Sequence, residues 1–127
     1  MTKLEDLNIS FSGIEEDCIP ILLEEDLKGT LRRLDVSYSI LNEGGGMAAI
    51  AQFGQLRYLN MQRCKIPPGS LGLLVEDGCN MKNTLEVLNV SSNSGLRSGD
   101  MEEISQMTHL RLSLIHIYLT REKWGKV

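Results

Sequence analysis

One apolar phrase occurs four times in this chain of 127 residues: Leu, two residues, Leu, one residue, and an aliphatic residue. The four copies are Leu4/Leu7/Ile9, Leu31/Leu34/Val36, Leu56/Leu59/Met61 and Leu85/Leu88/Val90. Their first leucines lie 27, 25 and 29 residues apart. The alternation within each copy predicts a short β-strand with one buried face. Because a single unit has no partner for its apolar face, we expect the copies to stack on one another.

A turn position follows each expected strand. Three residues after the aliphatic residue stands a small polar residue or a cysteine, namely Ser12, Ser39, Cys64 and Asn93. Two residues later the first three copies have another aliphatic residue, namely Ile14, Leu41 and Ile66. The fourth copy has Gly95 there and Leu96 next, a slip of one residue. We interpret Cys64 as a structural residue of this turn rather than a reactive thiol.

The segments between the strands have helical patterns. Apolar residues recur at helical spacing in residues 18–28 and 47–54, and Gly54 suits a helix end. Two further helices are expected over residues 70–78 and 100–107, with Ser70 and Asp100 as N-cap residues. The chain therefore alternates strands and helices, which predicts an α/β fold.

These features resemble the leucine-rich repeat family, whose unit is LxxLxLxxN/CxL with a period of about 20–29 residues. The resemblance covers residues 4 to 110 and is similar to the ribonuclease-inhibitor-like and related intracellular subtypes. It implies a horseshoe-shaped solenoid of about four repeats, with a parallel β-sheet on the concave side and helices on the convex side. We accordingly assign residues 1–110 to a repeat domain and expect the chain to be a fragment of a longer protein.

Residues 111–127 form an atypical tail. They have a net charge of +3, whereas residues 1–30 have a net charge of −6. The repeat register is lost near Leu110 and is restored if the next copy starts at Leu112. The hexapeptide at 112–117, LSLIHI, is also one translated frame of a transposase adaptor used in sequencing libraries. We interpret residues 112–127 as an assembly artefact, the alternative being an atypical terminal repeat that caps the stack.

Composition and motifs exclude several classes of function. A net charge of −4 argues against a protein that binds nucleic acid through phosphate contacts, and no apolar run approaches the length of a membrane span. Three scattered cysteines form neither a disulfide framework nor a metal motif, which favours a reduced, cytoplasmic protein. The segment 44–49 fits G-x-G-x-x-A, so a dinucleotide-binding enzyme fragment stays a remote alternative. We otherwise find no catalytic constellation and expect no enzyme activity, cofactor, metal or small-molecule substrate.

The variable positions of the repeat point toward the concave surface, and they define the expected binding site. The residues chosen there are Phe11, Arg33, Asp35, Tyr38, Tyr58, Asn60 and Arg63. Aromatic and Arg side chains dominate protein interfaces because they bury a large area at low entropic cost. We therefore expect a non-enzymatic module that binds a protein partner. The alternative is a regulatory segment of a ubiquitin-ligase adaptor or a GTPase-activating protein.

Overall fold

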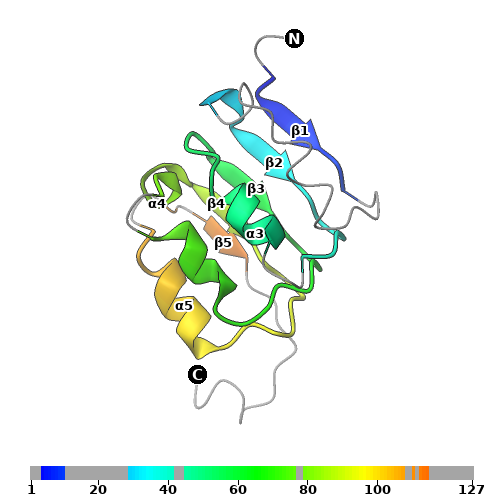
Figure 1. Cartoon of the computed structure of the whole chain (residues 1–127), viewed down its shortest axis with the longest axis vertical. Coiled ribbons are helices and arrows are strands. Elements are labelled where there is room, and N and C mark those ends of the chain that lie inside the picture. The colour runs from blue at the N-terminus through cyan, green and yellow to red at the C-terminus, as the bar shows by residue number, and fades with distance from the viewer. Residues whose placement is uncertain are drawn as a thin grey trace.

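A five-stranded parallel β-sheet, with its strands in the order of the chain, organises the molecule (Figure 1). The computed structural model describes residues 4–10, 29–41, 45–76, 79–107, 110 and 112–114. The strands are β1 (Asp6–Asn8), β2 (Arg33–Asp35), β3 (Tyr58–Asn60), β4 (Val87–Asn89) and β5 (Leu112–Leu114). The predicted α/β class with a parallel sheet is confirmed.

The strands pair in the register of the repeated phrase. Its second leucine pairs with the second leucine of the next copy, from Leu7 through Leu34 and Leu59 to Leu88. Equivalent positions therefore form columns that run across the sheet. Leu88 pairs with Ser113, so the fifth strand continues the register that starts at Leu110, and the expected restart at Leu112 is wrong. The sheet also extends past the expected domain boundary at residue 110.

The core lies on one face of this sheet. The leucines and aliphatic residues of the second, third and fourth copies are at most 3% exposed. Met47, Ile50 and Phe53 pack against them from the segments between the strands and are equally buried. In the first copy the equivalent residues Leu4, Leu7 and Ile9 are only half-buried. Among the described residues, the apolar column is therefore fully covered from β2 to β4.

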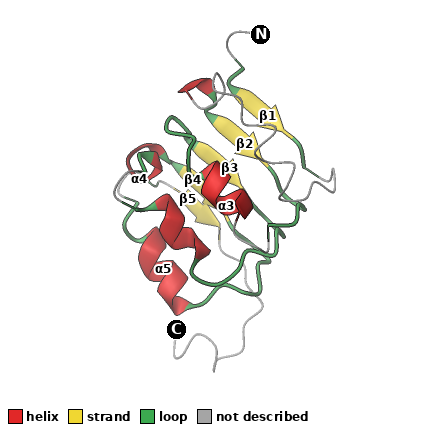
Figure 2. Ribbon diagram, viewed as in Figure 1, coloured by secondary structure: helices red, strands yellow, loops and turns green. Residues whose placement is uncertain are grey.

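The helical segments lie on one side of the sheet (Figure 2). They are α3 (Gly45–Ile50), the 3-10 helix η2 (Ser70–Leu74), α4 (Met81–Thr84) and α5 (Ser98–Ile104). The structure confirms helices near three of the four expected places, although α3 is shifted toward the N-terminus and residues 70–74 adopt the tighter 3-10 form. The expected helix 18–28 lies outside the described residues. The short helix α4 has no sequence signal, because four residues are too few to show a period.

Both expected N-caps are wrong. Gly69, in the left-handed conformation with φ of 86°, is the N-cap of η2, and Ser70 is its first, buried residue. Asp100 lies three residues after Arg97, the N-cap of α5. Its carboxylate accepts hydrogen bonds from the backbone N–H of Arg97 (2.9 Å) and of Gly69 (2.8 Å). One buried carboxylate thus closes the first turn of α5 and fixes the start of η2, a tertiary role that local capping rules do not predict.

The turn after β4 depends on Asn93. Its side-chain oxygen accepts hydrogen bonds from the backbone N–H of Cys64 (2.9 Å) and Ile66 (3.2 Å) in the preceding copy. Its amide group donates to the carbonyls of Met61 and Val90 at 2.9 Å and to that of Ser91 at 3.2 Å. A buried side chain with all these bonds ties two neighbouring turns together.

The one-residue slip in the fourth copy has a steric cause. A Cβ atom added to Gly95 would lie 2.8 Å from the carbonyl oxygen of Ile66. The position that is aliphatic in the other copies therefore has no room for a side chain here. Leu96, the next residue, is fully buried and fills the core instead.

Candidate binding surface

The exposed face of the sheet is formed by the residues that alternate with the buried leucines. On β2, Arg33 is exposed and Asp35 half-buried, while Leu34 between them is 3% exposed. The same alternation holds for Tyr58 and Asn60 on β3 around the fully buried Leu59. All side chains expected at the binding site that fall within the strands lie on this face.

The Asn and Asp column at the strand ends has a structural role. In each of four copies the side-chain oxygen accepts a hydrogen bond from the backbone N–H two residues later, at 2.9–3.0 Å. The acceptors are Asn8, Asp35, Asn60 and Asn89, and the donors are Ser10, Ser37, Gln62 and Ser91. Asn60 also donates to the second carboxylate oxygen of Asp35 at 3.3 Å. Asp35 and Asn60 therefore fix the ends of the strands, a role that the sequence analysis missed.

Arg33 and Tyr58 meet at the beginning of the strands. The guanidinium carbon of Arg33 lies 4.2 Å from the centre of the Tyr58 ring, a cation–π contact. The Nε of Arg33 is 3.3 Å from the carboxylate of Asp6. Stacking and ion pairing restrict an arginine that is still 56% exposed. A restricted but accessible arginine beside an aromatic ring is typical of a protein-binding hot spot.

Tyr38 and Arg63 form a second pair beyond the other end of the strands. The guanidinium carbon of Arg63 lies 5.7 Å from the centre of the Tyr38 ring. Both residues occupy the left-handed region, with φ of 65° and 53°, as does Ser92 in the equivalent position of the next copy. The expected cluster therefore consists of two pairs separated by the layer of Asp35 and Asn60. Phe11, the remaining expected site residue, lies outside the described residues.

A hollow of about 470 Å³ opens at the beginning of the strands. It is lined by Glu5, Asp6, Arg32, Arg33, Arg57, Tyr58, Glu86 and Val87. Half of these residues directly follow the first leucine of a repeated phrase, a place called here the first variable position. The binding site expected from the sequence did not include this position. The signal was available in the sequence, because that position is charged in all four copies.

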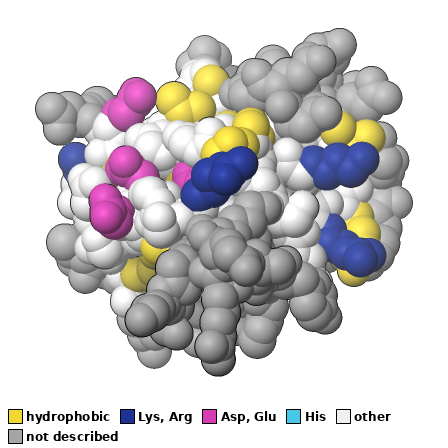
Figure 3. Space-filling view, turned by 90° about the horizontal axis from the view of Figure 1, so that it is seen from below, with side chains coloured by type: hydrophobic (Ala, Val, Ile, Leu, Met, Phe, Trp, Pro, Cys, Tyr) yellow, Lys and Arg dark blue, Asp and Glu magenta, His cyan; other side chains and the backbone are white. Residues whose placement is uncertain are grey.

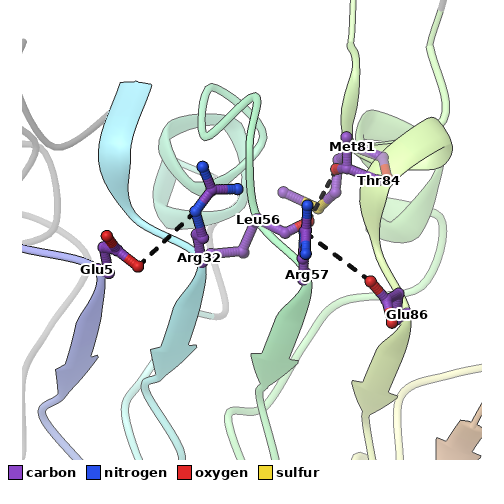
Figure 4. Close-up of polar contacts among 7 residues, drawn as sticks. All are labelled: Glu5, Arg32, Leu56, Arg57, Met81, Thr84 and Glu86. Carbon is purple, nitrogen blue, oxygen red and sulfur yellow. Dashed lines mark hydrogen bonds and ion pairs between the residues drawn. The ribbon is translucent and has the colours of Figure 1, made fainter.

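The four charged residues at the first variable position lie in a row, with the two arginines in the middle and a glutamate at each end. Figure 4 shows Arg32 and Arg57 side by side, with Glu5 and Glu86 on their outer sides. The Nε of Arg32 is 3.8 Å from the carboxylate of Glu5, and the Nε of Arg57 is 3.9 Å from that of Glu86. These separations are longer than a hydrogen bond, and exposed pairs of this kind contribute little to stability.

Two threonines join neighbouring copies through hydrogen bonds. The hydroxyl of Thr84 donates to the carbonyl of Leu56 at 2.8 Å (Figure 4). Thr30, which also immediately precedes a repeated phrase, donates to the carbonyl of Leu4 at 3.0 Å. These hydrogen bonds join neighbouring copies at Leu4 and Leu56, which directly precede the lining residues Glu5 and Arg57 in the chain.

The face seen from below has charged side chains of both signs (Figure 3). Acidic side chains lie mostly at one side of this view, with a basic side chain at the same edge, and other Lys and Arg side chains lie at its centre and opposite side. A second hollow of about 470 Å³ lies among the helical segments and is lined by Ala51, Gln52, Gly54, Leu73, Glu76, Cys79 and Asn80. None of these lining residues belongs to a strand of the sheet.

Cys64 is a titratable residue that lies fully buried in the core. Burial raises the pKa of the Cys64 thiol to about 11, and Cys64 donates to the carbonyl of Val36 at 3.2 Å. Within the described ranges, no three His, Cys, Asp or Glu residues are placed to hold a metal ion. The helix α3 begins inside the glycine run at Gly45, and both Gly46 and Met47 are buried.

No protein-family model matches the chain, and neither a curated protein nor a solved structure matches it significantly. None of the helices in the described segments is long and apolar enough to cross a bilayer.

Proposed function

We propose that this chain is a leucine-rich repeat solenoid whose exposed sheet face binds a protein partner. The solenoid assignment is supported by the periodic phrase and by parallel strands that pair in chain order and in the register of that phrase. A turn asparagine that bonds to the backbone of two copies supports it further.

The observation that supports the binding role most strongly is the Arg33–Tyr58 stack beside the hollow. Its guanidinium and ring are held 4.2 Å apart before any partner arrives. A partner that packs on them therefore loses less conformational entropy than it would against free side chains. The module acts by binding and needs no catalytic group of its own.

Photocrosslinking tests this proposal directly. A photoreactive phenylalanine analogue replaces Tyr58 in the full chain, which is then irradiated in a cell extract. The matched control has the same analogue at Gln52, which is exposed in the hollow among the helical segments. We expect one or a few discrete protein adducts from position 58 and none of these from position 52.

The adducts must also depend on the neighbouring side chain. Arg33→Ala in the crosslinking variant should weaken the adduct about tenfold, as expected for loss of a hot-spot residue. Circular dichroism checks that both variants are folded. Adducts of equal yield from positions 58 and 52 contradict the proposal.

A further inference from the structure

The hollow at the beginning of the strands has an unusual order of charges. Along the sheet the first variable positions are Glu5 on the β1 side, Arg32, Arg57, and Glu86 on the β4 side. Arg33, at the second variable position, adds a third cation beside Arg32. Three guanidinium groups thus gather at the centre, where neighbouring strands are about 4.8 Å apart, and the carboxylates stay at the two margins.

The central arginines are available to a partner. Arg32 and Arg57 approach Glu5 and Glu86 only at 3.8 and 3.9 Å, too far for hydrogen bonds. Their side chains are 40% and 60% exposed. In Figure 4 the terminal nitrogens of Arg32 point away from Glu5. A carboxylate placed between the two arginines would receive short charge-assisted hydrogen bonds in place of long, solvated ion pairs.

Within the described sheet, neither of the nearby aspartates bonds to Arg32 or Arg57 in the way that such a carboxylate would. Asp35 lies two residues beyond Arg33 on the same face, but its oxygens are engaged by Ser37 at 2.7 and 2.9 Å and by Asn60 at 3.3 Å. The carboxylate of Asp6 lies 3.3 Å from the Nε of Arg33, so its ion pair is with Arg33 and not with Arg32 or Arg57. The carboxylates that line the hollow therefore stay at its margins, and the side chains of Arg32 and Arg57 remain accessible to a carboxylate of a partner.

We propose that the hollow binds an acidic segment of the protein partner, with an Asp or Glu side chain seated between Arg32 and Arg57. A basic residue two positions earlier in that segment lies over Glu5. The spacing agrees, because one and a half strand separations are about 7 Å and two residues of an extended peptide span about 6.7 Å. This inference rests on the proposed function, since it specifies the chemistry of the partner at the same surface.

Two synthetic peptides test the charge requirement. The probe is acetyl-Gly-Lys-Gly-Asp-Gly-amide, and its matched control has Asn in place of Asp. The full chain, labelled with ¹⁵N, is titrated with each while the Nε–H signals of the arginines are followed by NMR. We expect saturable shifts for Arg32 and Arg57 with the Asp peptide and none with the Asn peptide.

Charge reversal in the protein completes the test. Arg57→Glu should weaken binding of the Asp peptide about tenfold or more, because it removes a charge-assisted contact and adds repulsion. Arg97→Glu, an exposed position that does not line the hollow, should leave the affinity unchanged. Equal shifts with both peptides, or equal affinity of Arg57→Glu, overturn the inference.

The outcome is separable from that of the proposed function. If a phosphoserine peptide saturates these signals and the Asp peptide does not, the carboxylate assignment is wrong. If neither peptide binds but adducts still form at position 58 and not at position 52, the acidic specificity fails and the binding face stands. If those adducts are also absent, the proposed function fails as well.

Discussion

The turns after β2 and β4 occupy equivalent positions of the repeat but are satisfied very differently. After β4, the buried Asn93 uses both ends of its amide and bonds to five backbone groups. After β2, Ser39 is 1% exposed, and its hydroxyl is buried without a hydrogen-bond partner among the described residues. The comparison teaches that an amide at this position can bond to the backbone of the preceding copy, whereas the shorter hydroxyl of Ser39 bonds to none of the described residues.

Cys64, at the same position after β3, is intermediate between the two. Its thiol donates to the carbonyl of Val36 at 3.2 Å and to that of Gln62 at 3.5 Å. It thus reaches one carbonyl of the preceding copy but has no amide oxygen to accept bonds in return. The three copies form a series from Ser39 through Cys64 to Asn93 in which the bonds to the backbone increase.

The largest expected effect is that of Asn93→Ala. The substitution leaves several buried backbone groups without partners, so we expect a loss of about 3 kcal/mol in the free energy of unfolding. Urea unfolding measures it. The control Asn89→Ala removes only the bonds to Ser91 at the end of β4 and should cost about 1 kcal/mol. Equal costs would mean that the buried turn is not special.

The contribution of Cys64 to the free energy of unfolding should depend on pH. Its pKa is raised from 9.0 to about 11 in the folded chain, so the unfolded thiol loses its proton first as the pH rises. The stabilisation is complete below pH 9 and is lost as the pH rises through 11, by about 3 kcal/mol in all. Urea unfolding of the wild type and of Cys64→Val should therefore diverge between pH 8 and pH 11. Parallel pH profiles would show that the thiol does not titrate as described.

A substitution at Gly95 tests how closely the turn of the fourth copy approaches that of the third. Gly95→Ala places a Cβ atom 2.8 Å from the carbonyl oxygen of Ile66, and the backbone must move to relieve the clash. We expect a thermal unfolding transition at lower temperature and a cost of about 2 kcal/mol. The control Gly99→Ala meets no atom within 4 Å and lies in α5, so it should be neutral or stabilising. A neutral Gly95→Ala would contradict the steric account of the slip.

The smallest effect is expected at Ser39 and has the opposite sign. Ser39→Ala removes a buried hydroxyl that has no partner in the described structure, and should stabilise the chain by about 1 kcal/mol. The same change at Ser37, whose hydroxyl donates to Asp35 at 2.7 Å, should destabilise it. Chemical denaturation of the two variants checks the sign. Destabilisation by Ser39→Ala would show that this hydroxyl has a partner.

The strands and their register were predictable because the apolar pattern determines them. Shifting a strand by one residue would expose Leu34 or Leu59, so the leucines fix both the buried face and the pairing. The N-caps were not predictable, because Asp100 is placed by its bond to Gly69, more than thirty residues away in the chain. The fifth strand was misjudged because Ser113 pairs where a leucine is expected.

The candidate site was predictable only in part. The stack of Arg33 on Tyr58 follows from their equivalent positions on paired strands. The structural role of Asp35 was missed because an Asx turn depends on the backbone leaving the strand. The hollow was missed because Arg32 and Arg57 come one residue before the strands begin, where alternation no longer indicates which way a side chain points.

The most direct test of the account is the affinity of the crosslinked partner for three forms of the chain. These are the wild type, Tyr58→Ala on the exposed face of the sheet, and Gln52→Ala in the hollow among the helical segments, all measured by titration calorimetry. We predict that Tyr58→Ala weakens binding about tenfold or more, while Gln52→Ala binds like the wild type. Unchanged affinity of a folded Tyr58→Ala, with a loss in Gln52→Ala, would place the binding site on the helical side instead.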